Sequence, residues 1–239
     1  MQTNLLQCKP LAAAVTAACA FAAVNAHAAL QGRDLDGDAA TFEAYYDTNL
    51  HITWDANANE LGFNGYANEG RLTWAAASAL LPTVSLYGGP TGWRLPKVLP
   101  SASSGTYNDG FSNDGSTDVG YANNGTGWGT ASELGNLFYV TLGNSRLALT
   151  NTGPFTGLSA NDYWNTPSFA GAGQPVAFSF NTGVGLQSLA STDFTYKSWL
   201  VRDGDVGSVT AVPEPETYAL MLVGLIGVVA MKRRPALRV

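Results

Sequence analysis

Cysteine, histidine and charged side chains are scarce in this chain of 239 residues. It holds two cysteines and two histidines, of which only His51 lies after residue 28, so a zinc site in the rest of the chain, which needs several such ligands, is excluded. Charged residues make up 13% of the chain, where soluble domains ordinarily carry about 25%. Lys and Arg number 12 against 18 acidic residues, which argues against a nucleic-acid partner because phosphates require clustered basic side chains. The hydrophobic content of 46% nevertheless supplies ample material for a core.

Residues 1–28 have the composition of a secretory signal peptide. Lys9 precedes an uncharged apolar run at 11–24, and small residues follow it, as signal peptidase requires. Cleavage is predicted at the small side chains Ala26, Ala28 and Ala29, with Ala29 as the new N-terminus. The alternatives are an N-terminal membrane anchor, for which a run of about 14 residues is short, and lipidation at Cys19, which lacks the large aliphatic residue expected three positions earlier.

Residues 212–239 combine three parts in a fixed order. An extended, rigid Pro213-Glu214-Pro215 segment comes first and leaves the chain accessible to a protease. The apolar run 217–231 then predicts a transmembrane helix, although about 15 residues is less than a standard span. The basic cluster Lys232, Arg233 and Arg234 would hold the end of that helix on the cytoplasmic side.

This order resembles the PEP-CTERM sorting signal of Gram-negative bacteria. The resemblance implies processing by a membrane protease called an exosortase. It also implies export by the general secretory route, transient anchoring in the inner membrane, and delivery to the cell surface or to an extracellular biofilm matrix. The alternative is a plain single-pass tail anchor.

The remaining body, residues 29–211, is predicted to be one acidic domain without thiols, because Cys8 and Cys19 both lie in the leader. Seven basic and sixteen acidic residues give it a net charge near −9. Such a body repels anionic surfaces and attracts cations or basic partners.

The pattern of the body predicts an α+β fold with two helices and long loops. A helix is expected over 72–81, and a second begins at the cap Ser132. Residues 100–130 read as a long loop and 92–97 as an extended segment. The apolar residues expected on the buried sides of the two helices are Leu72, Ala75, Ala76, Ala79 and Leu80, then Leu134, Leu137, Phe138, Thr141 and Leu142. Strands are expected at 41–46, 50–54, 163–166, 176–181, 185–189 and 197–202.

Several segments of the body resemble the DUF1566 family. They are Thr73-Trp74-Ala75-Ala76-Ala77, Gly92-Trp93-Arg94-Leu95-Pro96, Tyr163-Trp164-Asn165-Thr166, Ala177-Phe178-Ser179-Phe180 and Trp199 to Asp205. The resemblance implies a C-type lectin-like single domain, in which the N- and C-terminal strands pair and two helices flank a twisted antiparallel sheet. It also implies non-enzymatic binding of a surface carbohydrate or protein. The sulfated polysaccharide that one branch of the family binds is not expected here, because the body is acidic. The signature residues expected to be structural are Trp93, Arg94, Leu95, Pro96, Trp164, Trp199 and Arg202.

Candidates for catalysis are few, so an enzyme is not predicted. His51 is the one histidine outside the leader, it is expected in a strand, and no Gly-x-Ser-x-Gly elbow accompanies it. The cysteine chemistry of formylglycine-generating relatives needs thiols that the body lacks. Two alternatives stay open: a secreted hydrolase that acts on matrix polysaccharide through an acidic pair, and a structural matrix component without a discrete ligand.

Two acidic loops are candidate calcium sites, and no other cofactor is expected. The loop at 108–118 is preferred, with Asp109, Asp114 and Asp118 as ligands, ahead of the cluster at 34–38. Neither fits the EF-hand spacing, and Asx-turns account for both without a metal. Trp128, in a glycine-rich loop, is the aromatic side chain predicted to be exposed for stacking on a sugar.

Overall fold

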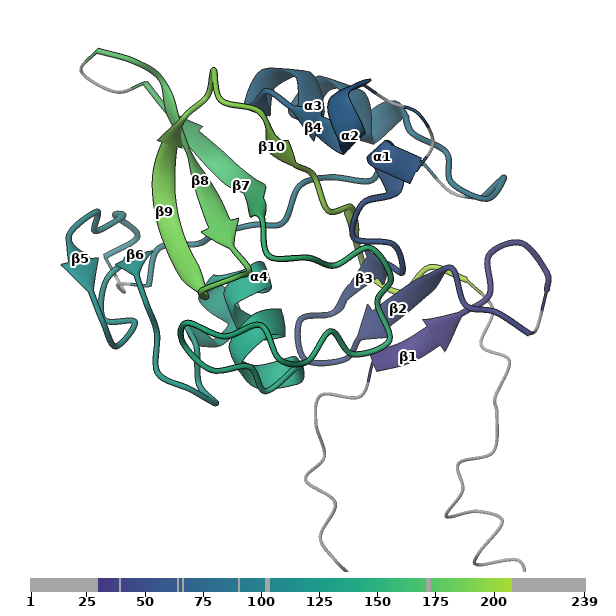
Figure 1. The fold of residues 1–239 in the computed structure, drawn as a ribbon, viewed down its shortest axis with the longest axis horizontal. Helices are drawn as coiled ribbons and strands as arrows, with labels where there is room; N and C mark the ends of the chain where they lie inside the picture. Colours follow the sequence, from purple (N-terminus) through teal and green to yellow (C-terminus); the bar gives the residue numbers. More distant parts are fainter. Residues whose placement is uncertain are drawn as a thin grey trace, which may run out of the picture.

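The computed structural model describes residues 30–38, 40–63, 65, 67–89, 91–101, 104–170 and 173–207 (Figure 1). The predicted signal peptide and the predicted C-terminal helix lie outside the described residues, as do their processing sites. Within the described ranges, no helix is both long enough and apolar enough to cross a membrane.

A four-stranded antiparallel sheet holds the first and last strands of the described body. Its order is β1 (Leu30–Arg33), β2 (Ala44–Asp47), β3 (Ile52–Asp55) and β11 (Val201–Asp203). The resemblance predicted direct pairing of the terminal strands, but β11 pairs with β3, with Val201 opposite Trp54. An ion pair between the buried Arg33 and the exposed Asp205 adds a second link between the two ends, because Arg33 Nε lies 2.5 Å from Asp205 Oδ1.

A second, larger sheet makes up the other half of the molecule (Figure 1). Its order is β4 (Arg71–Leu72), β10 (Tyr196–Lys197), β7 (Asp162–Phe169), β8 (Val176–Asn181), β9 (Leu186–Ser191), β6 (Val119–Gly120) and β5 (Phe111–Ser112). The two short contacts β10–β7 and β5–β6 are parallel, and the other strand pairs are antiparallel. The strand predicted at 197–202 is split into β10 and β11, because residues 198–200 carry the chain from one sheet to the other.

Strand β8 matches its predicted bounds but not its predicted exposure. Alternation of Phe178 and Phe180 with smaller residues predicted that one face is buried. The structure buries both faces, since Ala177 and Ser179 are also buried. Neighbouring side chains of a strand point to opposite faces, so both faces of this part of the sheet are covered.

The predicted helix at 72–81 forms in part and buries a different side. Helix α3 spans Trp74–Leu80, because Leu72 belongs to β4 and the Thr73 side chain caps the helix by accepting from Ala76 N. Ala77 is the buried residue within α3, whereas Ala75, Ala76 and Ala79 are exposed. A single 3₁₀ turn, Leu81–Thr83, continues the chain, and the structure also has the short helices α1 (Glu60–Phe63) and α2 (Ala67–Gly70).

The helix predicted to start at Ser132 is confirmed. Helix α4 spans Glu133–Asn136 and continues as a π-helical turn over Leu137–Thr141, after a 3₁₀ turn at Gly129–Ala131. The Ser132 hydroxyl accepts the Gly135 N–H at 3.0 Å, as expected for an N-cap. The residues predicted on its apolar side are all buried: Leu134, Leu137, Phe138, Thr141 and Leu142.

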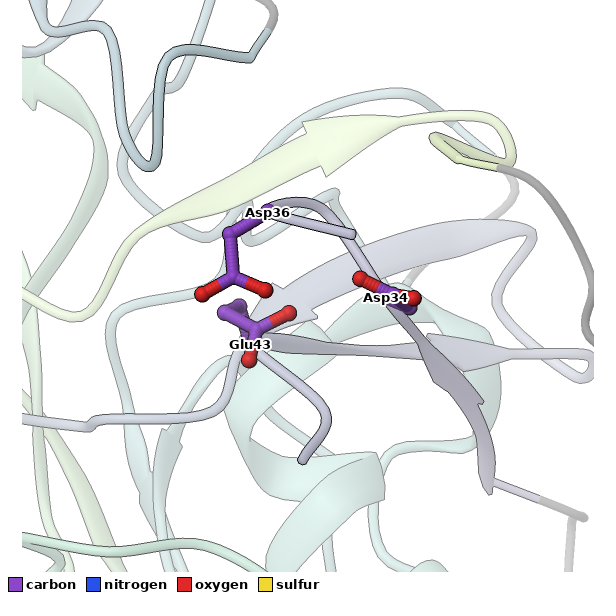
Figure 2. A group of neighbouring side chains, drawn as sticks. All are labelled: Asp34, Asp36 and Glu43. Atoms are coloured by element: carbon purple, nitrogen blue, oxygen red, sulfur yellow. The ribbon is translucent and has the colours of Figure 1, made fainter. Parts of the chain in front are cut away.

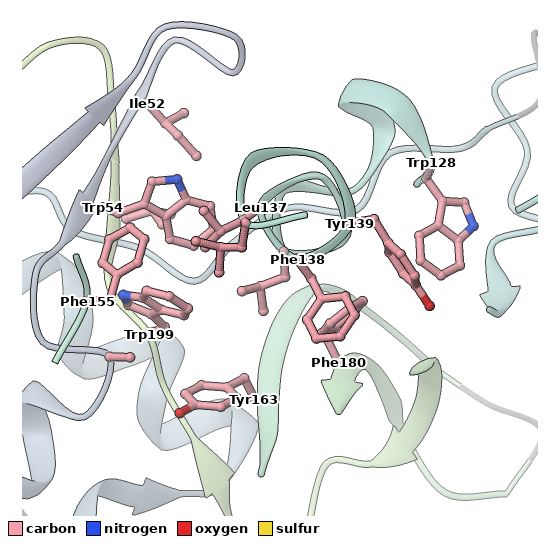
Figure 3. Close-up of a cluster of buried hydrophobic side chains, with 14 of the residues drawn as sticks. Ile52, Trp54, Trp128, Leu137, Phe138, Tyr139, Phe155, Tyr163, Phe180 and Trp199 are labelled. Carbon is pink, nitrogen blue, oxygen red and sulfur yellow. The ribbon is translucent and has the colours of Figure 1, made fainter. Parts of the chain in front are cut away.

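Aromatic side chains dominate the core that joins the two sheets (Figure 3). The ring of Trp199 lies 5.0 Å from that of Trp54 and 4.9 Å from that of Phe155, between centroids. The ring centroids of Phe138 and Phe180 lie 5.6 Å apart, and this contact links the π-helical turn after α4 to β8. Such buried aromatic pairs add stabilisation beyond the burial of their area, which is consistent with a body that has no disulfide.

Candidate functional site

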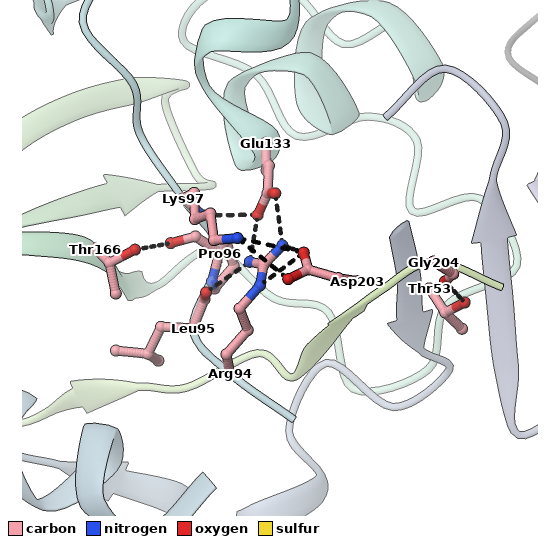
Figure 4. Close-up of polar contacts among 9 residues, drawn as sticks. All are labelled: Thr53, Arg94, Leu95, Pro96, Lys97, Glu133, Thr166, Asp203 and Gly204. Atoms are coloured by element: carbon pink, nitrogen blue, oxygen red, sulfur yellow. Dashed lines mark hydrogen bonds and ion pairs between the residues drawn. The ribbon is translucent and has the colours of Figure 1, made fainter. Parts of the chain in front are cut away.

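The segment Trp93–Pro96 takes part in a polar cross-link (Figure 4). Arg94 donates two hydrogen bonds of 2.8 Å to the carboxylate of Glu133, the first residue of α4, and also pairs with Asp203 on β11. Glu133 accepts in addition the backbone N–H of Lys97 at 2.6 Å. Hydrogen bonds from Arg94 lower the pKa of Asp203. This Arg94 network (Arg94, Lys97, Glu133 and Asp203) fastens three separate segments together.

The signature tryptophans lie in the core, as predicted for structural residues. Trp93, Trp164 and Trp199 are almost completely buried. The indole of Trp164 donates to Leu72 O at 2.7 Å, and that of Trp199 donates to Asp55 O at 2.9 Å. Leu95 is also buried, Pro96 O accepts the Thr166 N–H at 2.8 Å, and Arg202 is half-buried on β11.

The prediction that Trp128 is exposed is wrong. Its side chain is buried, and its indole N–H donates to Thr117 O at 2.7 Å. The ring contacts Tyr139 and Phe180 edge-on. The flanking glycines suggested a surface loop, but the loop folds back so that the indole fills the core.

The predicted calcium loop uses its last carboxylate, that of Asp118, to hold nearby backbone. Asp118 is buried, and its two oxygens accept the N–H groups of Ser101 and Asn108 at 2.8 Å each. Asp114 is exposed and accepts the Ser116 N–H at 3.0 Å. Asp109 is exposed as well. No group of three ligand atoms from this loop converges among the described residues.

Three carboxylates converge instead just after β1. Asp34, Asp36 and Glu43 place ligand atoms within 4.8 Å of one another (Figure 2). Asp34 and Asp36 belong to the second acidic cluster found in the sequence, and Glu43 was missed. These oxygens already accept hydrogen bonds: Gly37 N–H to Asp34, Asp38 N–H to Asp36, and Leu35 N–H and the Thr41 hydroxyl to Glu43. The Asx-turn explanation therefore accounts for the Asp34 and Asp36 contacts.

His51 lies in a turn before β3 and not in the strand where it was expected. Its φ of 54° is left-handed, and its side chain is exposed. The ring Nδ1 lies 3.2 Å from the Tyr46 hydroxyl. These contacts do not supply the nucleophile and the orienting carboxylate that a catalytic triad needs.

A cavity of about 980 Å³ lies beside the first sheet. It is formed by the residues around β2, by the start of α1, and by the loops at 84–87 and 154–156. Glu43, Tyr45, Glu60 and Tyr87 contribute its chemically distinctive side chains, with Asn57 and Thr156 beside them. No Lys, Arg or His is among its described lining residues. We call this cavity the acidic pocket.

The electrostatics of the acidic pocket are set by three carboxylates. Glu43 and Glu60 are 7% and 4% exposed, and Asp55, at the end of β3, is fully buried. Burial raises the pKa of Asp55 well above its usual value. The hydrogen bond from Asn57 N–H lowers this pKa, and the nearby charge of Glu60 raises it further. Burial likewise raises the pKa of Tyr87, and Asp55, Glu60 and Glu43 raise it further. The Tyr87 hydroxyl therefore lies within the field of all three carboxylates.

Sequence reasoning did not predict this pocket. Glu43, Glu60 and Tyr87 come from three segments with no shared motif, and Tyr87 stands in a turn with a left-handed φ of 55°. The one local signal was the richness of 41–60 in acidic and aromatic residues. Strand pairing, which the sequence does not specify by itself, decides that these side chains converge.

Comparison with known proteins identifies one segment of the chain. The PEP-CTERM protein-sorting motif matches residues 211–234, which include Pro213 to Pro215 and the basic cluster at 232–234. No curated protein and no solved structure matches the chain. The sorting motif implies an exported surface protein that is sorted by an exosortase.

Proposed function

We propose that the body of this exosortase-sorted protein is a non-enzymatic carbohydrate-binding domain of C-type lectin-like type, and that the acidic pocket is its binding site. The observation that carries the proposal is a cavity of about 980 Å³ lined by two buried glutamates and two tyrosines without a basic side chain among its described lining residues. Ligand pockets commonly have volumes of about 300–1,000 Å³ and combine aromatic walls with a few placed polar groups.

The chemistry of the pocket favours a hydroxyl-rich ligand that is neutral or cationic. Carboxylate oxygens accept hydrogen bonds, so Glu43 and Glu60 suit hydroxyl and ammonium groups. A tyrosine ring attracts a cation to its face, and Tyr45 and Tyr87 both line the cavity. The net charge of the body acts in the same direction and repels polyanions.

A polysaccharide of the extracellular matrix fits this site better than another surface protein does. The candidate groups line a hollow in which Glu43 and Glu60 are buried, whereas protein interfaces are broad and rely on exposed anchors. Export through signal peptidase and an exosortase, with a transient inner-membrane anchor, would bring the domain to such a matrix.

The proposal is tested by calorimetric titration of the purified full-length chain with three tetrasaccharides: one of glucosamine, one of glucose and one of a uronic acid. We expect the glucosamine oligomer to bind most tightly and the uronic acid oligomer not to bind. Glu60→Gln should weaken glucosamine binding about tenfold, in proportion to the loss of one charged hydrogen bond of about 1.5 kcal/mol. Asp193→Asn, an exposed charge removal in the turn after β9, is the matched control. Absence of binding by every oligomer would refute the proposal.

A secreted hydrolase is the second candidate, because Glu43 and Glu60 line one cavity and glycoside hydrolysis uses a pair of carboxylates. The same samples distinguish the two functions. Shorter products in the chromatogram that disappear with Glu60→Gln would establish the hydrolase, and binding with intact oligomers would establish the binding domain.

A further inference from the structure

We infer that the acidic pocket continues into a neighbouring pocket and that the two together bind consecutive units of one oligosaccharide chain, an inference that rests on the proposed carbohydrate-binding function. The neighbouring pocket has a volume of about 500 Å³ and is lined by residues that include Asn59, Glu69, Gly157 and Lys197. Asn57 and Thr156 line both pockets.

The two shared residues form a fixed strip of backbone. Asn57 and Thr156 make a parallel β-bridge. Thr156 N–H donates to Ala56 O at 2.8 Å, and Ala58 N–H donates to Thr156 O at 2.9 Å. Backbone that is bonded on both sides is held in place, so a ligand meets the same preformed surface in both pockets.

Gly157 keeps this strip free of a further side chain. Its φ is +67°, a conformation that glycine adopts without strain. A Cβ atom at this position would lie 2.4 Å from Asn57 Oδ1 and 3.3 Å from Asn59 N. Any larger residue would therefore displace the Asn57 side chain, which accepts the Asn59 N–H at 3.0 Å.

The chemistry of the neighbouring pocket complements that of the acidic pocket. Glu69 and Lys197 bring opposite charges, and Asn59 adds an amide. Lys197 Nζ is 3.1 Å from the Ser159 hydroxyl, which fixes its position. Donors and acceptors are thus both available, as the hydroxyls of a sugar unit require. An amine-bearing unit in the acidic pocket, followed by a unit held through its hydroxyls, satisfies both pockets.

The test is the dependence of affinity on chain length, measured by calorimetric titration of the full-length chain with glucosamine and its β-1,4-linked dimer, tetramer and hexamer. Because one unit occupies each pocket, we expect affinity to rise at least about tenfold from the monomer to the dimer. Asn59→Ala and Glu69→Gln, as two independent variants, should each remove most of that gain and leave monomer affinity unchanged. Glu60→Gln should weaken the monomer and the dimer by the same factor, and Asp193→Asn should alter neither.

Two results would overturn the inference in distinguishable ways. Equal affinity for monomer and dimer, or equal weakening of both by Asn59→Ala and Glu69→Gln, would leave a single-pocket binding site and refute the extended groove alone. Absence of binding by every oligomer would refute the groove together with the proposed function.

Discussion

Replacement of Arg94 by methionine is expected to destabilise the fold strongly, because the substitution keeps an unbranched apolar stem and removes the guanidinium. Glu133 would lose two hydrogen bonds of 2.8 Å and keep only the Lys97 N–H. The Glu133 side chain is 11% exposed, whereas that of Asp203 is 66% exposed. The effect therefore comes mainly from leaving Glu133 inadequately paired, and we estimate a loss of about 2–4 kcal/mol in the free energy of unfolding.

The measurement is urea unfolding followed by tryptophan fluorescence and circular dichroism. For a body of this size the loss corresponds to a Tm lowered by about 5–15 °C. Asp203→Asn is the matched control and should cost less than about 1 kcal/mol, since the Asp203 side chain is 66% exposed. In the double variant Arg94→Met with Glu133→Gln, the neutral amide should recover part of the loss. A loss below about 1 kcal/mol for Arg94→Met, or one no larger than that of Asp203→Asn, would refute the reasoning.

Two further predictions concern buried carboxylates. Asp118→Ala should lower the free energy of unfolding by about 2–4 kcal/mol, because two loop N–H groups lose their acceptor; urea unfolding measures this, and an effect no larger than that of the exposed Asp114→Ala would contradict it. The raised pKa of Asp55 means that the folded state holds its proton more tightly than the unfolded chain does. Its contribution to stability is therefore full below the usual pKa of an aspartate and is lost as pH rises through the folded value. Stability measured against pH should fall less steeply over that range in Asp55→Asn, and parallel curves for the two proteins would contradict the assignment.

Local features of the fold were predictable where one segment carries its own signal. The bounds of β8 follow from its run of aromatic and small residues between turns, and the start of α4 follows from the Ser132 cap. Trp164 and Trp199 are buried, which agrees with the prediction that such tryptophans at strand positions lie in the core. In each case the interaction that forms the feature either lies within a few residues of the sequence pattern that predicts it or depends on hydrophobic burial alone.

Features that depend on distant segments were not predictable. The prediction of the buried side of α3 was wrong, because contact with the second sheet, and not the alanine pattern, decides that Ala77 faces inward. The prediction that Trp128 is exposed was wrong, because its flanking glycines gave no indication of the hydrogen bond to Thr117. The acidic pocket was missed for the same reason, since Glu43 and Glu60 meet only after β2 and β3 have paired.

The shared sheet of the first and last strands has a mechanical consequence. A load applied through the C-terminal end of the described body enters at β11, which lies antiparallel to β3, so the ladder between them bears it in shear. The Arg33–Asp205 pair passes part of the same load to β1. The long strands β7, β8 and β9 belong to the other sheet and form no strand pair with β11. A pull on that end therefore acts directly on the first sheet.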